Sequence, residues 1–301
     1  MKLDKIALEE YKDIMHSKIQ DFENPEDPYR NGYIVRCGRK KLAVIGGRHK
    51  SNDTMIFYLM EKAFKAIKPK VVLLEQPKDL KVGKFMGSVK NRDKKFWNEF
   101  DAAADLAVRN KAELYFIDIS DKELFESFMQ MKDGIKLYIL FRFSGTYKTI
   151  FNTYNKTRKI ENEDYKILSE SFLLRDIIND NQIYNAFIKV KEKEYRNMDL
   201  IATIDRVVEE TTKRYTGKKL SHDMLIGNLT APFPYANYEI NKIGAMLEAK
   251  RDSIMLHEVI NHLKKADSAM FICGRGHAAI MRKYLLRELK RFGKCALEKI
   301  E

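Results

Sequence analysis

The sequence predicts an α/β protein with a mainly parallel central sheet and a largely helical insertion. The first observation is an alternation of strand and helix patterns at βαβ spacing between residues 33 and 118. The second is the unbroken apolar run 71–74, which is typical of a strand covered on both faces. The third is that the alternation resumes after the insertion. Residues 31–119 and 238–301 are therefore expected to form one discontinuous core.

The chain begins with an amphipathic pattern over residues 3–20, which predicts a helix. That pattern ends before the turn-rich stretch 24–28, so residues 1–30 are expected to be an N-terminal helix and linker. Residues 33–37 and 42–45 then predict a short pair of strands.

The first βαβ units follow. The polar stretch 51–53 can cap a helix that runs to about Lys68, just before Pro69. The strand at 71–74 comes next. A second helix is expected over 93–110, followed by a strand at 113–117.

Between residues 120 and 237 helical periodicity dominates and strands are hard to find, which predicts the helical insertion. The remaining elements are then expected in the order helix, strand, helix, strand, over residues 238–265, 268–273, 278–291 and 294–300.

The composition bounds the class of protein. Of 301 residues, 45% are hydrophobic, which is enough for a sizeable core. The longest apolar stretch, 135–143, contains Lys136 and Arg142 and is too short to span a bilayer, so no membrane span is expected. The first residues include acids where a signal peptide would have an apolar segment, which favours a cytoplasmic protein.

Charge and cysteine usage add two expectations. The net charge of +13 admits a nucleic-acid partner but does not favour one, because the lysines are spread along the chain among acidic residues. The three cysteines, Cys37, Cys273 and Cys295, form no Cys-x-x-Cys pair, and free thiols are expected.

Four polar motifs follow predicted strands. They contain His49, Glu75, Asp118 and His277. The carboxyl ends of parallel strands form the ligand crevice of an open α/β sheet, so these side chains are expected to converge. A lone histidine at a strand end is more often structural, but polar residues at four strand ends favour a functional site.

The two histidines share the local pattern strand, Gly-x-x-His, helix, which starts at Gly46 and at Gly274. Glycine permits a sharp turn and close backbone approach to a cofactor. A histidine near a helix N-terminus is favoured in its neutral form, which can bind a metal or accept a proton. With Glu75, the pair His49 and His277 makes a two-histidine, one-carboxylate ligand set for a divalent metal.

Arg251 lies in the middle of an apolar stripe on the helix predicted over 238–265. An unpaired charge facing the core is costly, so Arg251 is expected to meet a buried partner. That partner is either a substrate oxygen in the crevice or a carboxylate, such as Asp118 or Glu75. The pattern leaves both interpretations open.

In this order and spacing, the two Gly-x-x-His motifs, Glu75 and Arg251 resemble the TraB/PrgY–Tiki superfamily, whose relatives include erythromycin esterases and ChaN-like haem-binding proteins. The matching stretches are residues 42–76, 99–118 and 251–285. The resemblance implies a three-layer α/β sandwich with its active site at the strand ends. It implies His49, Glu75, Arg251 and His277 as site residues.

Members of the superfamily differ in chemistry. Tiki-type members are metal-dependent proteases, esterase-type members use a histidine base without metal, and ChaN-like members bind haem. We therefore expect a hydrolase of amide or ester bonds in a small-molecule or peptide substrate, with Mn, Co or Zn held by His49, His277 and Glu75. Arg251 would stabilise the oxyanion. The alternatives are a module that binds haem or an anionic ligand, and a nucleic-acid-associated protein; the oligomeric state stays open.

Overall fold

The computed structural model describes the backbone of residues 27–29, 31–49, 52–120, 123–124, 126–127 and 239–300, and side chains of the last range from 247 onward. The chain divides into two compact units, Met1–Asp121 with Met246–Glu301, and Lys122–Ala245. The helix predicted over 3–20 lies outside the described residues, and so does the helical insertion predicted over 120–237 apart from residues 120, 123–124 and 126–127.

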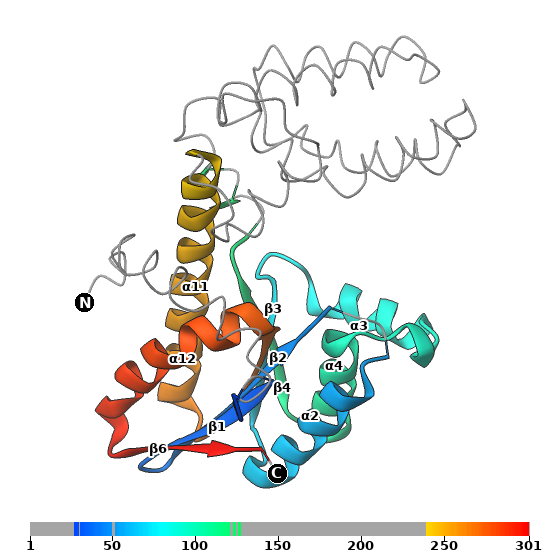
Figure 1. Cartoon of the computed structure of the whole chain (residues 1–301). Coiled ribbons are helices and arrows are strands. Elements are labelled where there is room, and N and C mark those ends of the chain that lie inside the picture. The colour runs from blue at the N-terminus through cyan, green and yellow to red at the C-terminus, as the bar shows by residue number, and fades with distance from the viewer. Residues whose placement is uncertain are drawn as a thin grey trace. The chain divides into compact units, whose positions relative to one another are not determined.

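A six-stranded sheet runs through the first unit in the order β4-β3-β5-β2-β1-β6 (Figure 1). Strands β4, β3, β5 and β2 are parallel, whereas β1 pairs antiparallel with both β2 and β6. The prediction of an α/β fold with mostly parallel strands is confirmed. The strands are β1 Gly32–Cys37, β2 Lys40–Gly47, β3 Val71–Pro77, β4 Glu113–Asp118, β5 Ser268–Gly274 and β6 Cys295–Lys299.

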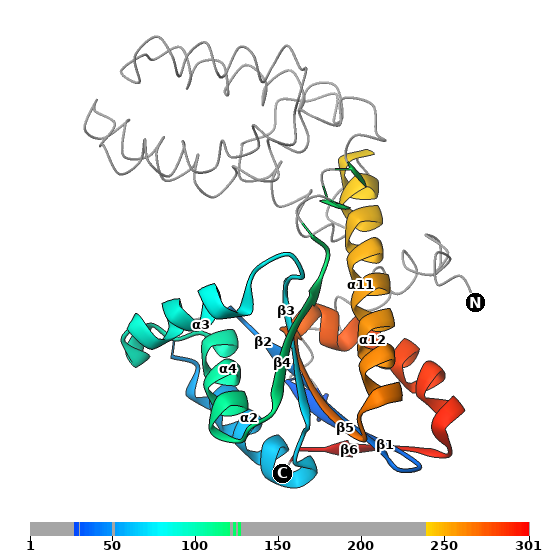
Figure 2. The same cartoon turned by 180° about the vertical axis from the view of Figure 1, so that it is seen from behind.

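Helices lie on either side of this sheet, with α2 and α4 on one side and α11 and α12 on the other (Figures 1 and 2). No helix in the described part of the chain is long and apolar enough to cross a membrane. The helices are α2 Thr54–Ile67, α3 Val82–Asn91, α4 Glu99–Arg109, α11 Glu239–Lys265 and α12 Arg275–Leu289, with 3₁₀ turns η2 Lys94–Phe96 and η4 Lys290–Phe292.

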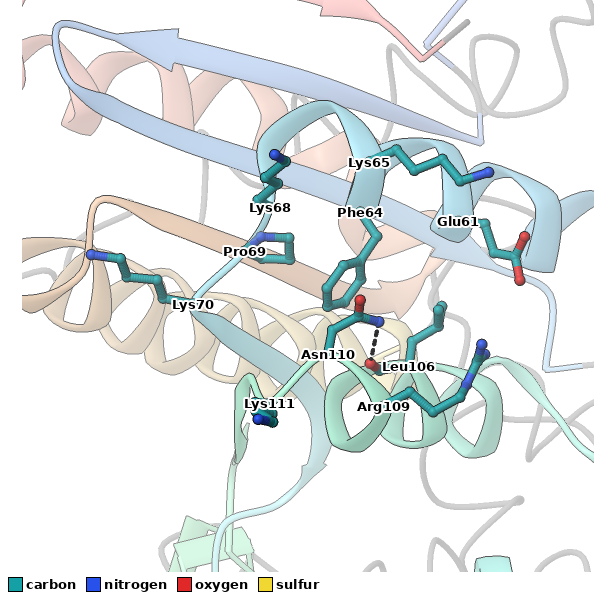
Figure 3. A pocket seen from close by; sticks show the side chains of 10 residues that line it. All are labelled: Glu61, Phe64, Lys65, Lys68, Pro69, Lys70, Leu106, Arg109, Asn110 and Lys111. Carbon is teal, nitrogen blue, oxygen red and sulfur yellow. Dashed lines mark hydrogen bonds between the residues drawn. The ribbon is translucent and has the colours of Figure 1, made fainter.

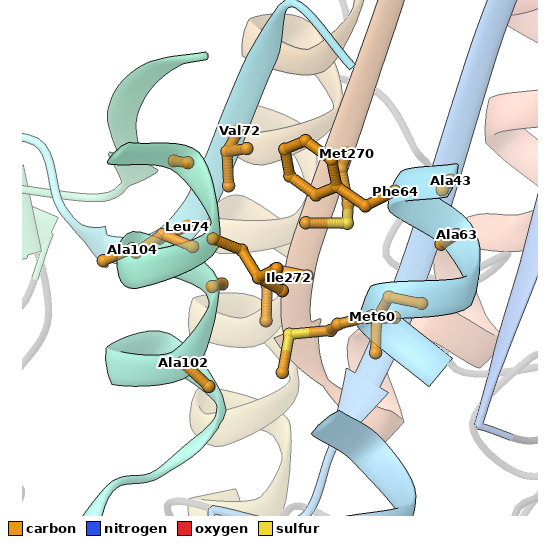
Figure 4. Close-up of a cluster of buried hydrophobic side chains, with 14 of the residues drawn as sticks. Ala43, Met60, Ala63, Phe64, Val72, Leu74, Ala102, Ala104, Met270 and Ile272 are labelled. Carbon is orange, nitrogen blue, oxygen red and sulfur yellow. The ribbon is translucent and has the colours of Figure 1, made fainter. Parts of the chain in front are cut away.

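The core under α2 and α4 is an apolar cluster that joins both helices to the central strands (Figure 4). Met60 and Phe64 of α2 meet Leu74 of β3 and Ile272 of β5 in this cluster. The α4 helix presents mainly alanines to it, and such small side chains let a helix approach a sheet closely. This packing fixes the strands whose ends carry the polar motifs.

Helix starts differ from prediction at two places, each for a local reason. The helix expected from residue 93 begins at Glu99, because Asn98 and Asp101 form a reciprocal capping box. The helix expected from residue 278 begins at Arg275, so that His277 lies in its first turn. Helix α3 was not expected, because its two glycines weaken the helical pattern.

The cysteine prediction is wrong. Cys37 of β1 and Cys295 of β6 stand opposite each other in the antiparallel register and form a disulfide. Their separation of 258 residues explains why no local pattern reveals the pair. Cys273 is a buried free thiol, as expected.

Candidate functional site

Four adjacent parallel strands end at one edge of the sheet, and each leads into one of the predicted polar motifs. Gly47 of β2 pairs with Gly274 of β5, and Pro77 of β3 pairs with Asp118 of β4. The residues of these motifs lie close together: Arg251 joins Glu75 to Asp118, Glu75 contacts His277, and His49 lies beside Gly274.

His49 is held by a buried acid that the sequence did not identify. Its imidazole Nδ1 lies 2.7 Å from Oε1 of Glu99, and its backbone N–H donates to the same oxygen at 3.0 Å. The Glu99 side chain is only 1% exposed, whereas the imidazole is half-exposed. A Cβ at Gly47 would overlap the Glu99 carboxylate, so glycine is needed there for Glu99 to reach the histidine.

The expected helix N-terminus beside His49 is not observed. Helix α2 begins at Thr54 and is capped by Asp53, while His49 itself has a left-handed backbone with φ of 54°. The bond to Glu99 raises the pKa of the His49 imidazole. The neutral form is therefore not favoured by a helix terminus, and the carboxylate is what orients the ring.

His277 has the same arrangement in a more buried setting. Its Nδ1 lies 2.6 Å from Oδ1 of Asp252, and its Nε2 lies 3.2 Å from Oε1 of Glu75 and 3.6 Å from Oε2 of Glu248. Burial alone would lower the pKa of this imidazole, but Glu75 and Asp252 outweigh burial and raise the pKa well above 6.5. The neutral His277 expected from its helix position is corrected for this reason.

Glu75 is the carboxylate at which the elements meet. Its Oε2 accepts the backbone N–H of Gly274 at 2.5 Å, and its Oε1 accepts from Nη2 of Arg251 at 2.7 Å. Burial raises the pKa of Glu75, but His277, Arg251 and the Gly274 N–H together overcome burial and hold that pKa well below its usual range. Glu75 is thus an ionised carboxylate.

The space next to Gly274 is shared by three predicted site residues. A Cβ placed on Gly274 would lie 3.0 Å from Nε2 of His49, 3.5 Å from Oε2 of Glu75 and 3.5 Å from Cδ2 of His277. Glycine at this position therefore leaves a small cradle between an imidazole nitrogen and a carboxylate oxygen.

The partners of Arg251 are carboxylates. Its position on the helix had left two kinds of partner open, a carboxylate or a substrate oxygen. Its Nη2 lies 2.6 Å from Oδ2 of Asp118 and 2.7 Å from Oε1 of Glu75. Its Nη1 lies 3.0 Å from Oε2 of Glu248. The guanidinium therefore ties β3, β4 and α11 together, and its contact with a substrate stays a prediction.

Acidic groups are in excess at this edge. Within the described part of the chain, the contacts at this edge join five carboxylates to one guanidinium and two imidazoles. Burial raises the pKa of Glu248, although Arg251 and His277 pull it down. A dication is the kind of ligand that such an excess attracts.

The donor chemistry fits a divalent metal, because both histidines use Nδ1 for a carboxylate and keep Nε2 on the side of Glu75. Within the described residues, no three His, Cys, Asp or Glu side chains form a ready metal cluster. The site thus has suitable donors around a shared space rather than a completed coordination sphere.

Glu99, Glu248 and Asp252 were missed by the sequence reasoning. Glu248 lies three residues before Arg251, a spacing at which helix side chains meet, so this acid had a usable signal. Asp252 directly follows Arg251, a spacing that gives no such signal. Glu99 begins α4, where an acid has an ordinary explanation through the helix dipole. Nothing local distinguishes it from such an acid.

Comparison with protein-family models, curated proteins and solved structures gives no match to this chain. The resemblance to the TraB/PrgY–Tiki superfamily therefore depends on the motifs and their spacing alone.

Proposed function

We propose that the protein is a hydrolase of the TraB/Tiki-like kind, which cleaves an amide or ester bond with the help of a divalent metal. One observation carries the proposal: His49 and His277 are each anchored through Nδ1 by a carboxylate that is 1% exposed, and both imidazoles border the space beside Gly274 that Glu75 also borders. Histidines ordered in this way are common in catalytic metal sites. The proposal includes a three-layer sandwich for the core.

His49 and His277 would hold the metal through Nε2, with Glu75 as the third ligand. A bound divalent ion would lower the pKa of a water molecule and polarise the scissile carbonyl. The excess of buried carboxylates supports a positively charged occupant. The lowered pKa of Glu75 favours its role as a ligand over a role as general base.

The other residues would position these groups. Glu99 and Asp252 would hold the two imidazoles in the tautomer that leaves Nε2 available. Arg251 would fix the Glu75 carboxylate and supply positive charge toward the developing oxyanion.

A hydrolysis screen with amide and ester substrates, run with Mn²⁺, Co²⁺ or Zn²⁺, tests the proposal. We expect His49→Ala and His277→Ala each to lower the rate by about a thousandfold, which is typical for loss of a catalytic group. His262→Ala is the matched control, because His262 is a helix histidine, on α11, whose ring contacts Tyr115 of β4 outside the site. If all three variants kept the wild-type rate, the proposal would be wrong.

A further inference from the structure

A hollow of about 630 Å³ lies at the opposite edge of the sheet, where β3 begins (Figure 3). It is formed by the last turns of α2 and α4 and the residues that follow them. Its lining is mostly basic, with five cations and a single carboxylate. The cations are Lys65, Lys68, Lys70, Arg109 and Lys111, and the carboxylate belongs to Glu61.

Most of this charge is uncompensated. Arg109 pairs with Asp105 at 2.7 Å, but the structure gives no ion pair to any of the four lysines within the described part of the chain. With Arg109 offset by Asp105, the four lysines and Glu61 leave a net charge of about +3, concentrated in one place. Clustering of this kind is the footprint of a phosphate-binding surface, whereas total charge alone is not.

Two of these lysines occupy positions where the backbone of a glycine would be less strained. Lys68, with φ of 45°, and Lys111, with φ of 56°, follow the ends of α2 and α4 in the left-handed conformation. Glycine is the usual residue there, because a side chain is strained in this conformation. Lysine at both positions places charge on the rim of the hollow at the expense of backbone strain.

The hollow offers little to a small ligand. The Phe64 ring at its centre is nearly buried, and the Asn110 amide already donates to the Leu106 carbonyl at 2.8 Å (Figure 3). The lysines are exposed and spread around the rim rather than converging on one point. Such a surface suits many weak contacts along a chain of phosphates.

We propose that this basic rim binds the sugar–phosphate backbone of a nucleic acid without reading its bases. No exposed aromatic group of the lining is available for base stacking, because Phe64, its one aromatic side chain, is 7% exposed. The rim lies about 16 Å from the candidate active site, which is the length of β3 from Lys70 to Glu75. Because the proposed reaction concerns amide or ester bonds, the bound nucleic acid is a partner rather than the hydrolysed substrate.

A second basic hollow, of about 450 Å³, provides an internal comparison on α12. Its Arg282 pairs with Asp27 at 3.1 Å, and its Arg287 with Glu288 at 3.6 Å. Only Lys283 and Lys290 of its cations have no ion pair among the described residues. Half of its cations are thus paired, and it serves as the control surface.

The test is binding of a labelled 20-base-pair DNA duplex by fluorescence anisotropy between about 50 and 200 mM salt. For roughly four phosphate contacts, the slope of log K against log salt is expected to be about −4. The double variant Lys68→Gly/Lys111→Gly removes two charges and relieves backbone strain, so it should fold at least as well as the wild type. Its slope should shrink by about 2 and its affinity at low salt should fall about tenfold.

The control variant Lys283→Ala/Lys290→Ala removes the same charge from the second hollow and should keep the wild-type slope. Duplexes of unrelated sequence should bind alike. The proposal is overturned by equal loss in both double variants, by the absence of binding to the wild type at low salt, or by a strong preference for one sequence.

Discussion

Oδ1 of Asp252 on α11 lies 2.6 Å from Nδ1 of His277 on α12. Glu99 holds His49 in the same way from α4. Two histidines from different strand ends are thus oriented by two buried acids. This pairing has consequences for catalysis, stability and pH dependence.

The acids that orient the histidines should be needed for activity without touching the substrate. Asp252→Asn and Glu99→Gln keep the side-chain size but remove the charge that fixes each imidazole. We expect each to lower metal affinity and hydrolysis by about 10- to 100-fold. Asp105→Asn, which changes a half-buried acid of α4 paired with Arg109 away from the site, should leave both unchanged. A wild-type metal affinity in Asp252→Asn and Glu99→Gln would contradict the positioning role.

Gly274 should be intolerant of the smallest side chain. The Cβ of Gly274→Ala would lie 3.0 Å from Nε2 of His49 and would fill the cradle. We expect metal binding to be lost while the circular dichroism spectrum stays native. Gly83→Ala in α3 is the control, because a Cβ there meets nothing within 4 Å and should raise stability by about 0.5–1 kcal/mol. Intact metal binding in Gly274→Ala would show that the cradle is not the site.

Arg251 should contribute strongly to stability. Arg251→Gln would leave Asp118, Glu75 and Glu248 buried without their cation, and removal of one partner of a buried ion pair costs about 3–5 kcal/mol. Denaturation with urea measures this loss. The control Arg109→Gln breaks an exposed pair and should cost less than about 1 kcal/mol. Equal costs for the two variants would show that the buried network does not hold the fold together.

The stability contributed by His277 should depend on pH in a defined direction. Its pKa is raised above 6.5 in the folded, metal-free protein, so the folded state holds the proton more tightly than the unfolded state. The contribution is therefore complete below about pH 6 and is lost as the pH rises through the folded-state pKa. The difference in unfolding free energy between wild type and His277→Gln should be constant in acid and should shrink in alkali. A difference that grows with pH would have the wrong sign.

The disulfide predicts a thiol count. Unfolded, unreduced protein should react with a thiol reagent at one cysteine per chain, Cys273, and at three after reduction. Reduction should also lower the midpoint of thermal unfolding, because the Cys37–Cys295 bond closes a long loop and such bonds contribute about 2–5 kcal/mol. Three reactive thiols before reduction would show that the bond is not formed.

Local patterns predicted the elements well where periodicity is strong. The run 71–74 became the buried part of β3, and the helix expected from 238 is α11. The start of α4 was misplaced because the capping box at Asn98 was not recognised, although the sequence contains it. The Cys37–Cys295 pair depends on strand register between distant segments, which no local pattern encodes.

Some residues of the candidate site were predicted from the sequence, and the acids around them were not. His49, Glu75, His277 and Arg251 were found because each breaks an apolar pattern at a strand end or on a helix stripe. The raised pKa values of the two histidines were not foreseen, because they depend on acids that reach the imidazoles across the fold. Placement of β5 between β2 and β3 is what brings Gly274 beside the other groups.

Calorimetric titration of the metal-free protein with Zn²⁺ or Mn²⁺ at low salt tests the shared site most directly. Wild type, His49→Ala, His277→Ala and the control His262→Ala are measured side by side. The account predicts about one ion bound per chain in wild type and control, a loss of binding in both site variants, and release of protons on binding because the raised-pKa imidazoles must give them up. No uptake by the wild type, or equal uptake by all four proteins, would contradict it.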